Sequence, residues 1–288
     1  MFGESKFEVL EKVPESCKPK AILLSLPITV DEVLKQMKEC ELSFPLIFKP
    51  DLGERGWMVK KIAHRQDIDN YLKKIKIKFI AQELVDLPLE FGVFYRRYPN
   101  ESMGAVTSIV GKEMLSITGD GKKTMQELIL EKDRAKLQWR TLKIVYRERL
   151  GHLVASGNKI ELISIGNHCL GTMFLNKNHL ITEKLSASFD RISKQIDGFY
   201  FGRFDLRVAT LEDLENGNVK VMELNGCGAE PAHIYEPGFS LIEALKVLLR
   251  HWKDIYLISV QNHHRGVAYI SFREARAIFK SFKTLTAP

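Results

Sequence analysis

The sequence lacks the features that mark membrane-spanning, secreted and repeat proteins. No apolar run among its 288 residues approaches the roughly 20 that are needed to span a bilayer. Residues 1–6 lack the charged-then-apolar pattern of a secretory signal, and no internal repeat or low-complexity tract is visible. With 45% hydrophobic and 27% charged residues, the composition predicts an ordinary globular protein with one large domain or two lobes and no membrane partner.

Cysteine is scarce and scattered. The chain has four, Cys17, Cys40, Cys169 and Cys227, and no two of them have the C-x-x-C spacing of a zinc or redox motif. This pattern predicts reduced thiols in a cytoplasmic protein rather than a disulfide framework. We expect no nucleophilic role for Cys227, because no histidine is paired with it in a recognisable pattern.

The charge balance is basic, with a net charge of +7 and a pI of about 9.1. Such a balance is compatible with nucleic acid, a membrane surface or a small anionic ligand. The lysines of residues 73–78 lie at the end of an expected helix over 67–76, where cations interact favourably with the helix dipole. No basic motif interleaved with aromatics appears, so we do not expect nucleic-acid binding.

The periodicity of the apolar residues predicts an α+β fold with antiparallel sheets. We expect four parts: a short N-terminal segment (1–40), a small lobe (41–86), a large lobe (87–258) and a C-terminal extension (259–288), with a hinge near 84–88. The expected strands are 21–26, 45–50, 58–62, 79–85, 90–98 and 104–110. The expected helices are 30–40, 67–76, 125–130, 176–196 and 240–257, with a charged amphipathic stretch running to about residue 149.

Two short motifs, one hairpin apart, carry the strongest chemical signal. Arg203, Asp205 and Arg207 alternate along one expected strand, and Glu223 and Asn225 alternate along the next. Two carboxylates and an amide oxygen on one face suit magnesium, and the arginines beside them suit phosphate. An internal salt bridge between the same carboxylates and arginines is an equally open interpretation, since acidic residues in apolar strands need a cation of some kind.

A lysine precedes a glycine-bearing turn in the small lobe. Lys49 ends an apolar strand, and Gly53 and Gly56 follow in a turn that lets the backbone approach a polyphosphate closely. The alternative is a surface lysine before a plain hairpin. The G-x-x-x-x-G-K-[ST] pattern of a Walker A loop is absent.

Polar groups also flank the expected hinge. Strand-end backbone groups in 82–85 could pair with an adenine edge, and the Glu90 carboxylate could accept two ribose hydroxyls. The alternative is a set of solvent-facing strand ends. A loop at Asn167, His168 and Gly171 could face a ligand or form a helix-entry turn.

Taken in order, these residues resemble the ATP-grasp superfamily over roughly residues 20–258. The series is Lys49, the glycine turn, the strand-end hinge, Glu90, F-D-x-R and E-x-N. Among relatives, the chain looks closest to the D-alanine–D-alanine ligase and cyanophycin-synthetase-like branches. The stretch 119–129, GDGKKTMQELI, is similar to a motif of the latter branch.

The resemblance implies an ATP-grasp fold of two α+β lobes clasping ATP, with one or two Mg²⁺ ions that Mn²⁺ could replace. It assigns Asp205, Glu223 and Asn225 to the metal, with Glu223 bridging. Lys49 would contact the α- and β-phosphates, and Arg203 would stabilise the transferred phosphate and the tetrahedral intermediate. The implied nucleotide contacts are Lys6, Lys49, Gly53, Arg55, Gly56, Gln82, Glu83, Leu84, Val85, Glu90 and Lys112. The implied substrate contacts are Arg207, Gly226, Gly228 and His168.

The implied activity is a carboxylate–amine ligase that activates an amino acid or a peptide-like substrate as an acyl phosphate. One departure matters: ligases of this family carry an N-terminal Rossmann-like domain, whereas only residues 1–44 precede Pro45. Residues 1–40 would be its remnant, and a homodimer or another chain would supply the rest. The alternatives are an enzyme that modifies a protein, for instance by extending a peptide tail, and a regulatory ATP-binding subunit without independent ligase activity.

Overall fold

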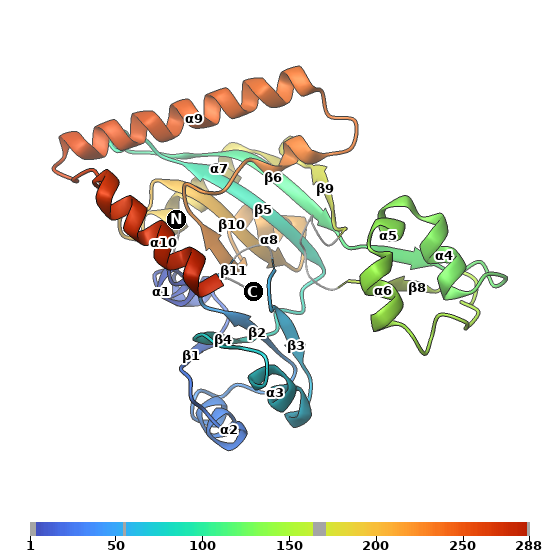
Figure 1. Cartoon of the computed structure of the whole chain (residues 1–288). Helices are drawn as coiled ribbons and strands as arrows, with labels where there is room; N and C mark the ends of the chain where they lie inside the picture. Colours follow the sequence, from blue (N-terminus) through green and yellow to red (C-terminus); the bar gives the residue numbers. More distant parts are fainter. Residues whose placement is uncertain (1–3, 54–55, 164–170, 287–288) are drawn as a thin grey trace. The chain divides into compact units, whose positions relative to one another are not determined.

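The computed structural model describes residues 4–53, 56–163 and 171–286 (Figure 1). The chain forms two compact units. The first joins residues 1–111 to 176–288, and the second comprises 112–175. Both combine helices with antiparallel strand pairs, so the predicted α+β class is confirmed. Within the described ranges, no helix has the length and apolar character needed to cross a membrane.

A four-stranded antiparallel sheet occupies the N-terminal part of the first unit. Its strands are β1 (Ala21–Leu24), β2 (Leu46–Pro50), β3 (Lys60–Ile62) and β4 (Phe79–Glu83), in the order β1-β4-β2-β3. Two helices, α2 (Val30–Glu39) and α3 (Arg65–Leu72), contribute Val33, Met37, Ile68 and Tyr71 to its core. Thr29 begins α2 with a capping box, because its hydroxyl accepts from Glu32 N while the Glu32 carboxylate accepts from Thr29 N.

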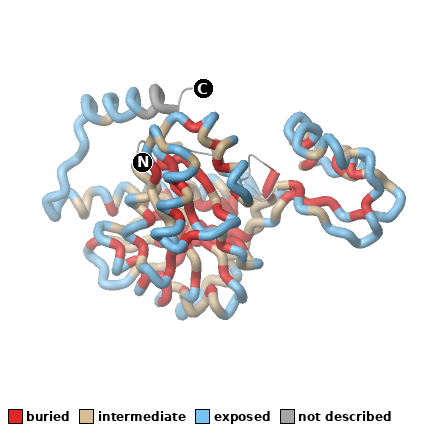
Figure 2. Tube along the Cα trace, turned by 90° about the horizontal axis from the view of Figure 1, so that it is seen from below, coloured by how far each residue is buried: buried red, intermediate tan, exposed pale blue. Residues whose placement is uncertain are grey.

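A five-stranded sheet has most of its residues in the first unit. It contains β5 (Leu89–Arg96), β6 (Ala105–Glu113), β9 (Met173–Asn176), β10 (Phe201–Val208) and β11 (Lys220–Asn225), in the order β11-β10-β5-β6-β9. One face is apolar and packs on α1 (Lys6–Glu11), α7 (Glu183–Ser193) and α8 (Leu211–Asn216). Figure 2 shows buried residues running along these strands. The packing of this face holds the strands in place and so fixes the positions of the side chains on the opposite face.

The opposite face divides into a polar part and an apolar part. Arg203, Asp205 and Arg207 share it with Phe94 and Phe201, because side chains alternate along β5 and β10. The apolar part is covered by the 24-residue helix α9 (Leu241–His264), whose buried His251 ring lies 5.2 Å from the ring of Phe94 and 5.0 Å from that of Phe201 (Figure 1). The polar part is left for the candidate site.

The second unit has its own small core. The hairpin of β7 (Ser116–Thr118) and β8 (Lys159–Glu161) packs with α4 (Met125–Glu131), α5 (Asp133–Leu137) and α6 (Trp139–Val145). The GDGKKT stretch forms a turn in which Asp120 accepts from the backbone N–H groups of Lys122 and Lys123. Thr124 and Glu127 then form a capping box that begins α4.

Three expected helices differ from the structure. The helix expected over 67–76 begins at Arg65 and ends at Leu72. The helix expected over 176–196 begins only at Glu183, because the Thr182 hydroxyl caps it by accepting from Leu185 N, and residues 173–176 form a strand instead. The helix expected over 240–257 continues to His264, and a further helix, α10 (Phe272–Thr286), follows it. The strands β7, β8 and β9 are too short for the periodicity to reveal them.

The core of the four-stranded sheet predicts a large loss of stability for one substitution. Phe48 is fully buried, with its ring 5.3 Å from the rings of both Tyr71 and Phe79. Phe48→Ala should lower the free energy of unfolding by about 3–5 kcal/mol in urea titrations. The same substitution at Phe272, which is 86% exposed, should leave it nearly unchanged. Equal losses for the two variants would contradict this account.

Candidate active site

The site begins with an unfavourable pairing between β10 and β11. In their antiparallel register, Asp205 lies directly opposite Glu223, and Arg203 lies opposite Asn225. Like charges directly opposite each other destabilise a sheet. This position therefore requires cations, supplied either by the protein or by a ligand.

A β-bulge sets which side chains face the site. The register skips Met222 between the Asp205–Glu223 and Leu206–Val221 pairs. As a result Val221 and Leu224 both point into the apolar core, while Glu223 faces the site. The Met222 carbonyl accepts from Lys49 Nζ at 2.9 Å and from Gln82 Nε2 at 3.4 Å.

Each carboxylate is paired with a cation of the first unit. Arg203 donates to Asp205 through Nε at 3.2 Å and through a terminal nitrogen at 3.1 Å, and Lys6 of α1 forms an ion pair with Glu223. Asn225 Nδ2 also donates to Asp205, at 2.8 Å. Burial opposes ionisation of Glu223, but the nearby Lys6 and Lys49 outweigh it and lower the pKa of Glu223. Both carboxylates thus already have a cationic partner within the protein.

Lys49 is the buried cation of the cluster. Its side chain extends from β2, and the residue is 8% exposed. Burial lowers the pKa of Lys49 to about 8, against the opposing attraction of Glu223. An ammonium group with so little water around it is a strong potential partner for a multiply charged anion.

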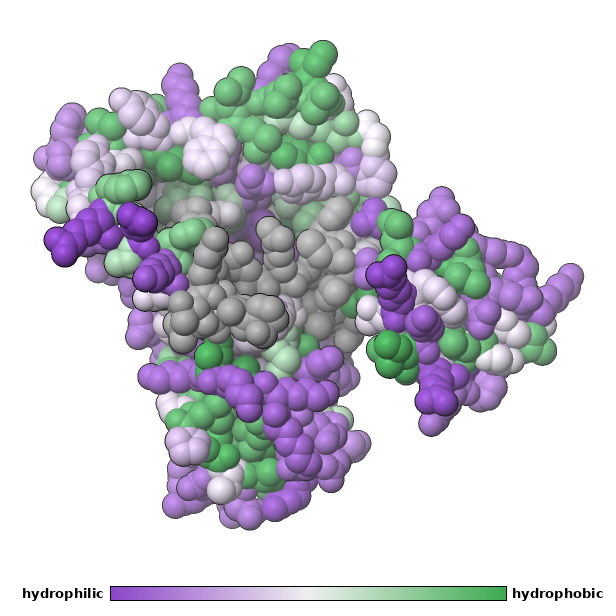
Figure 3. Space-filling model, viewed as in Figure 1, coloured by the Kyte–Doolittle hydropathy of each residue, from purple (hydrophilic) through white to green (hydrophobic). Residues whose placement is uncertain are grey.

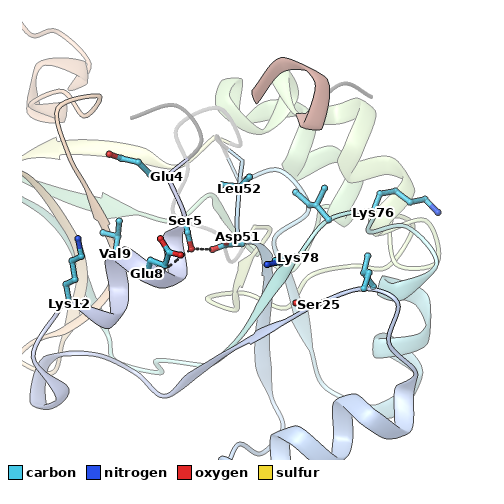
Figure 4. A pocket seen from close by; sticks show the side chains of 12 residues that line it. Glu4, Ser5, Glu8, Val9, Lys12, Ser25, Asp51, Leu52, Lys76 and Lys78 are labelled. Atoms are coloured by element: carbon cyan, nitrogen blue, oxygen red, sulfur yellow. Dashed lines mark hydrogen bonds between the residues drawn. The ribbon is translucent and has the colours of Figure 1, made fainter. Parts of the chain in front are cut away.

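One aspartate fixes Lys6 relative to Lys49. The buried Asp51, just after β2, accepts from Ser5 Oγ at 2.8 Å and from Phe7 N at 3.0 Å (Figure 4). Its carbonyl accepts from Lys6 N at 3.2 Å. Asp51 therefore anchors α1 to the end of the strand that carries Lys49.

A pocket of about 700 Å³ opens beside this anchor. Its lining includes Ser5, Lys12, Asp51, Lys76 and Lys78, which come from α1, the end of β2 and the segment before β4 (Figure 4). The charged residues described above, Lys6, Lys49, Arg203, Asp205 and Glu223, do not line it. The pocket is therefore a neighbour of the charged cluster and not the cluster itself.

Gly92 makes room for the arginine–aspartate pair. It lies in β5 opposite Asp205, and a Cβ there would lie 2.8 Å from Val110 Cγ1, 3.1 Å from Arg203 Cδ and 3.2 Å from Asp205 Oδ1. Any larger residue would push against both side chains of the pair. Glycine inside a strand otherwise weakens it, so close approach explains its presence here.

A second ion pair lies on the same sheet face. Arg207 donates from Nε to the buried Glu90 at 2.9 Å, and it also donates to the carbonyls of Val85 at 3.3 Å and Leu87 at 3.4 Å. Arg207 thus fastens the segment between β4 and β5 to β10. A carboxylate has about four lone-pair sites, so this pairing leaves the expected ribose contact of Glu90 possible.

The structure brings together part of the predicted set. Seven residues lie in one network of side-chain contacts and strand pairing that includes the Met222 carbonyl: Lys6, Lys49, Gln82, Arg203, Asp205, Glu223 and Asn225. Glu83, Leu84 and Val85 end β4 or follow it, Gly226 and Gly228 follow β11, and Gly53 and Gly56 lie in the turn after β2. Lys112 belongs to the second unit, and Arg55 and His168 lie outside the described residues. Their assigned roles stay predictions.

Three contributors escaped the sequence analysis. Met222 acts through its backbone carbonyl, Gly92 through the absence of a side chain, and Asp51 through contacts with residues 44 or more positions away. The only available signals were a glycine within an apolar strand and an aspartate directly after Lys49 and Pro50.

The donor atoms of the cluster fit a hard divalent cation. Asp205 and Glu223 provide carboxylate oxygens and Asn225 provides an amide, which is the donor chemistry of Mg²⁺ completed by water or phosphate. In the part of the chain that the structure describes, this cluster included, no three His, Cys, Asp or Glu side chains gather as a metal site, so two carboxylates and one amide are the donors available here. The interpretation as a salt bridge also describes this structure, because Arg203 and Lys6 occupy the carboxylates.

Neither a protein-family model nor a curated protein sequence matches the chain. Among solved structures, the chain is similar to the VanG D-Ala:D-Ser ligase of Enterococcus faecalis, with a TM-score of 0.48, 13% identity, and coverage of 86% of this chain and 61% of that one. It is also similar to the D-alanine–D-alanine ligase of Bacillus anthracis complexed with ATP, with a TM-score of 0.44, 14% identity, and coverage of 90% and 67%. A third is the ATP-grasp ligase PsnB complexed with a minimal precursor, with a TM-score of 0.43, 13% identity, and coverage of 88% and 60%.

The chain spans less than two thirds of the length of the first of these structures. All three are ligases, and one is an ATP-grasp ligase by name. Because each TM-score is below 0.5, we base the function proposed below on the geometry of the site.

The lowered pKa of Lys49 predicts a specific dependence of stability on pH. Between about pH 8 and 10.5 the unfolded chain still binds the Lys49 proton and the folded chain does not, so folding stability should rise with pH in this window. Relative to Lys49→Met, the wild-type free energy of unfolding should gain about 3 kcal/mol from this single group. Urea titrations from pH 7 to 11 measure it, and parallel curves for the two proteins would disprove the buried, perturbed lysine.

The close approach at Gly92 predicts that its smallest replacement is costly. Gly92→Ala should lower the free energy of unfolding by about 1–3 kcal/mol, because Val110 and the Arg203–Asp205 pair must shift. Gly151→Ala is the matched control, since a Cβ at Gly151 would meet nothing within 4 Å. Indistinguishable urea midpoints for the two variants would show that the sheet face is looser than described.

Proposed function

We propose that the chain is an ATP- and Mg²⁺-dependent carboxylate–amine ligase that works through an acyl phosphate. One observation carries the proposal: Asp205 and Glu223 lie opposite each other across β10 and β11, paired with Arg203 and Lys6, and Lys49 donates to the neighbouring Met222 carbonyl. Paired carboxylates with several cations gathered around them are what a metal–triphosphate complex requires.

The charge arrangement supports exchange of ion pairs on binding. The cluster has two carboxylates and three cations, and its present partners are all internal. When ATP and its metal bind, Asp205, Glu223 and Asn225 would turn to the metal. Lys6 and Arg203 would then be released toward phosphate oxygens, and Lys49 would contact the α- and β-phosphates. The metal would neutralise phosphate charge and orient the transferred group; Mn²⁺ offers the same coordination.

The proposed reaction has two steps. A substrate carboxylate oxygen attacks the γ-phosphorus, and the bond to ADP breaks to give an acyl phosphate. A neutral amine then attacks the acyl carbon, and inorganic phosphate leaves with the bonding electrons. Arg203, released from Asp205 but still held by the Glu230 carbonyl 3.2 Å away, would stabilise the negative charge of both steps.

The remaining predicted residues take supporting roles in this proposal. Residues 82–85 and Glu90 would frame the adenine and ribose, the turn with Gly53, Arg55 and Gly56 would cover the triphosphate, and Lys112 would add a further phosphate contact. Arg207, Gly226, Gly228 and His168 would face an amino acid or a peptide-like substrate. For Arg207 this would require exchange of its present bond to Glu90.

The setting of the enzyme is also part of the proposal. Cys17, Cys40 and Cys227 are free thiols, which supports a reducing, cytoplasmic environment. A homodimer, or a complex with a partner chain, is part of the same proposal.

The activity is tested by release of ADP from ATP with Mg²⁺, dependent on an added amino acid or short peptide, with the ligated product identified by mass. Asp205→Ala combined with Glu223→Ala should weaken binding of ATP·Mg²⁺ at least 100-fold by calorimetry, because two metal ligands are lost. Asp133→Ala combined with Glu148→Ala, two exposed acids of the second unit, is the control.

The outcomes separate the candidate functions. Unchanged ATP·Mg²⁺ affinity in the Asp205/Glu223 variant would refute the site. Tight binding to the wild type without turnover, against a broad panel of carboxylates and amines, would favour the regulatory ATP-binding subunit. A mass increase on a protein substrate would identify the protein-modifying alternative.

A further inference from the structure

The helix α9 has a second apolar face that the protein does not cover. Along it, large apolar side chains recur at helical spacing and are more than half exposed: Leu241, Ile242, Leu245, Leu249, Trp252 and Tyr256. We call these six residues the α9 stripe. Exposed fractions of 74% at Leu241 and 71% at Leu249 show that it is open along its first two turns and beyond. Green, hydrophobic side chains gather over α9 in Figure 3.

The α9 stripe is distinct from the face that holds the helix in place. The packed face presents His251, Asp254 and Ile258, which are buried. Asp254 accepts from Tyr98 Oη at 2.5 Å and lies 3.6 Å from Arg96 Nε. A helix with one buried face and an apolar stripe on another side belongs between two surfaces that exclude water, and the first unit supplies only one of them.

Exposed apolar groups continue directly beyond α9. Val267, Tyr269, Ile270 and Phe272 are between 56% and 86% exposed. The helix α10 that follows has an amphipathic sequence in which Arg273, Arg276 and Lys280 alternate with apolar positions. The apolar surface therefore runs through the whole segment from residue 241 into α10.

Positive charge accompanies this apolar surface. Lys246, Arg250 and Lys253 are exposed along one flank of the α9 stripe at helical spacing. Residues 241–288 hold eight Lys or Arg and three Asp or Glu, so they carry +5 of the net charge of +7. Of the three acids, Asp254 is buried against Tyr98 and Arg96, and Glu243 pairs with Lys246. The surface is therefore both apolar and cationic.

We propose that the α9 stripe and residues 265–272 bind the surface of an anionic phospholipid bilayer. Helices that lie in a membrane interface place Leu, Trp and Phe against the acyl chains and Lys and Arg against the headgroups, which is the arrangement here. Trp252, Tyr256 and Tyr269 have rings with one apolar body and one polar edge, which suit the headgroup boundary. The helix would lie parallel to the membrane, with its opposite face still packed on the five-stranded sheet.

Charge favours a bilayer over a second copy of this chain. The α9 stripe has the 3–4 spacing of a helix seam, at residues 242, 245, 249, 252 and 256. In an antiparallel pair of α9 helices centred on this seam, however, Lys246 of each helix would lie opposite Lys253 of the other. Two segments of +5 would repel each other, whereas an anionic bilayer neutralises both. The absence of a membrane-spanning helix in the described residues is compatible with this, since only surface binding is involved.

This proposal differs from the expectation of no membrane partner, which rested on the lack of a spanning segment. It does not depend on the proposed ligase activity. ATP is therefore left out of its test, so failure of one proposal leaves the other standing.

The test is co-sedimentation of the full chain with vesicles of phosphatidylcholine containing 30% phosphatidylserine, compared with phosphatidylcholine alone. We expect binding to the anionic vesicles at least tenfold above the neutral ones, reduced by 0.5 M NaCl. Lys246→Gln combined with Lys253→Gln should lower the partition coefficient about 25-fold, or about fivefold per charge. Leu249→Glu combined with Trp252→Glu should abolish binding.

The control variants carry the same changes at equally exposed places in the second unit. Leu137→Glu alters a leucine that is 82% exposed, and Lys143→Gln removes an exposed cation; both should bind vesicles like the wild type. Circular dichroism would confirm that every variant is folded. Binding that is equal for the two vesicle types, or unaffected by the α9 variants, would overturn the proposal. A dimer in sedimentation equilibrium that Leu249→Glu/Trp252→Glu dissociates, without vesicle binding, would assign the stripe to a second copy and also overturn it.

Discussion

The opposition of Asp205 and Glu223 across β10 and β11 is the constraint on which the site depends. Two carboxylates in this position repel each other, so the fold must bring cations to them. Arg203 comes from the same strand, Lys6 from α1 and Lys49 from β2, so parts of the first unit far apart in the sequence are tied to one spot. Asp51 and Gly92 then serve this arrangement, one by anchoring α1 and the other by leaving space.

The bulge at Met222 connects this electrostatic requirement to packing. Without it, the alternation of β11 could not direct Val221 and Leu224 to the core and Glu223 to the site together. The bulge also frees the Met222 carbonyl, which Lys49 and Gln82 bind from the four-stranded sheet. The one extra residue thus directs the Glu223 carboxylate to the site. It also links the two sheets through hydrogen bonds that would otherwise be missing.

Much of this was visible in the sequence because it is local. Alternation placed Arg203, Asp205 and Arg207 on one face, and turn and capping residues located α2 and α4. The late start of α7 was also readable, since Thr182 is a good N-cap that the wider apolar pattern obscured. The bulge, the Gly92 contact and the Arg207–Glu90 pair were not predictable, because each depends on strand register between residues up to 117 positions apart. The carboxylates can bind a metal or pair with Arg203 and Lys6. The choice depends on the free-energy difference between these two states, which a residue pattern does not specify.

The two faces of α9 extend the same argument from the site to the surface. Its buried face carries His251 and Asp254, whose polar groups find partners in the protein. Its exposed face carries Leu, Ile, Trp and Tyr side chains, which are unfavourable in water. A helix needing only to cover the sheet would reverse this choice, because exposed apolar residues add nothing to its packing there. Selection of apolar residues outside and cations beside them points to an environment that is itself apolar and anionic. A bilayer surface satisfies both conditions at once.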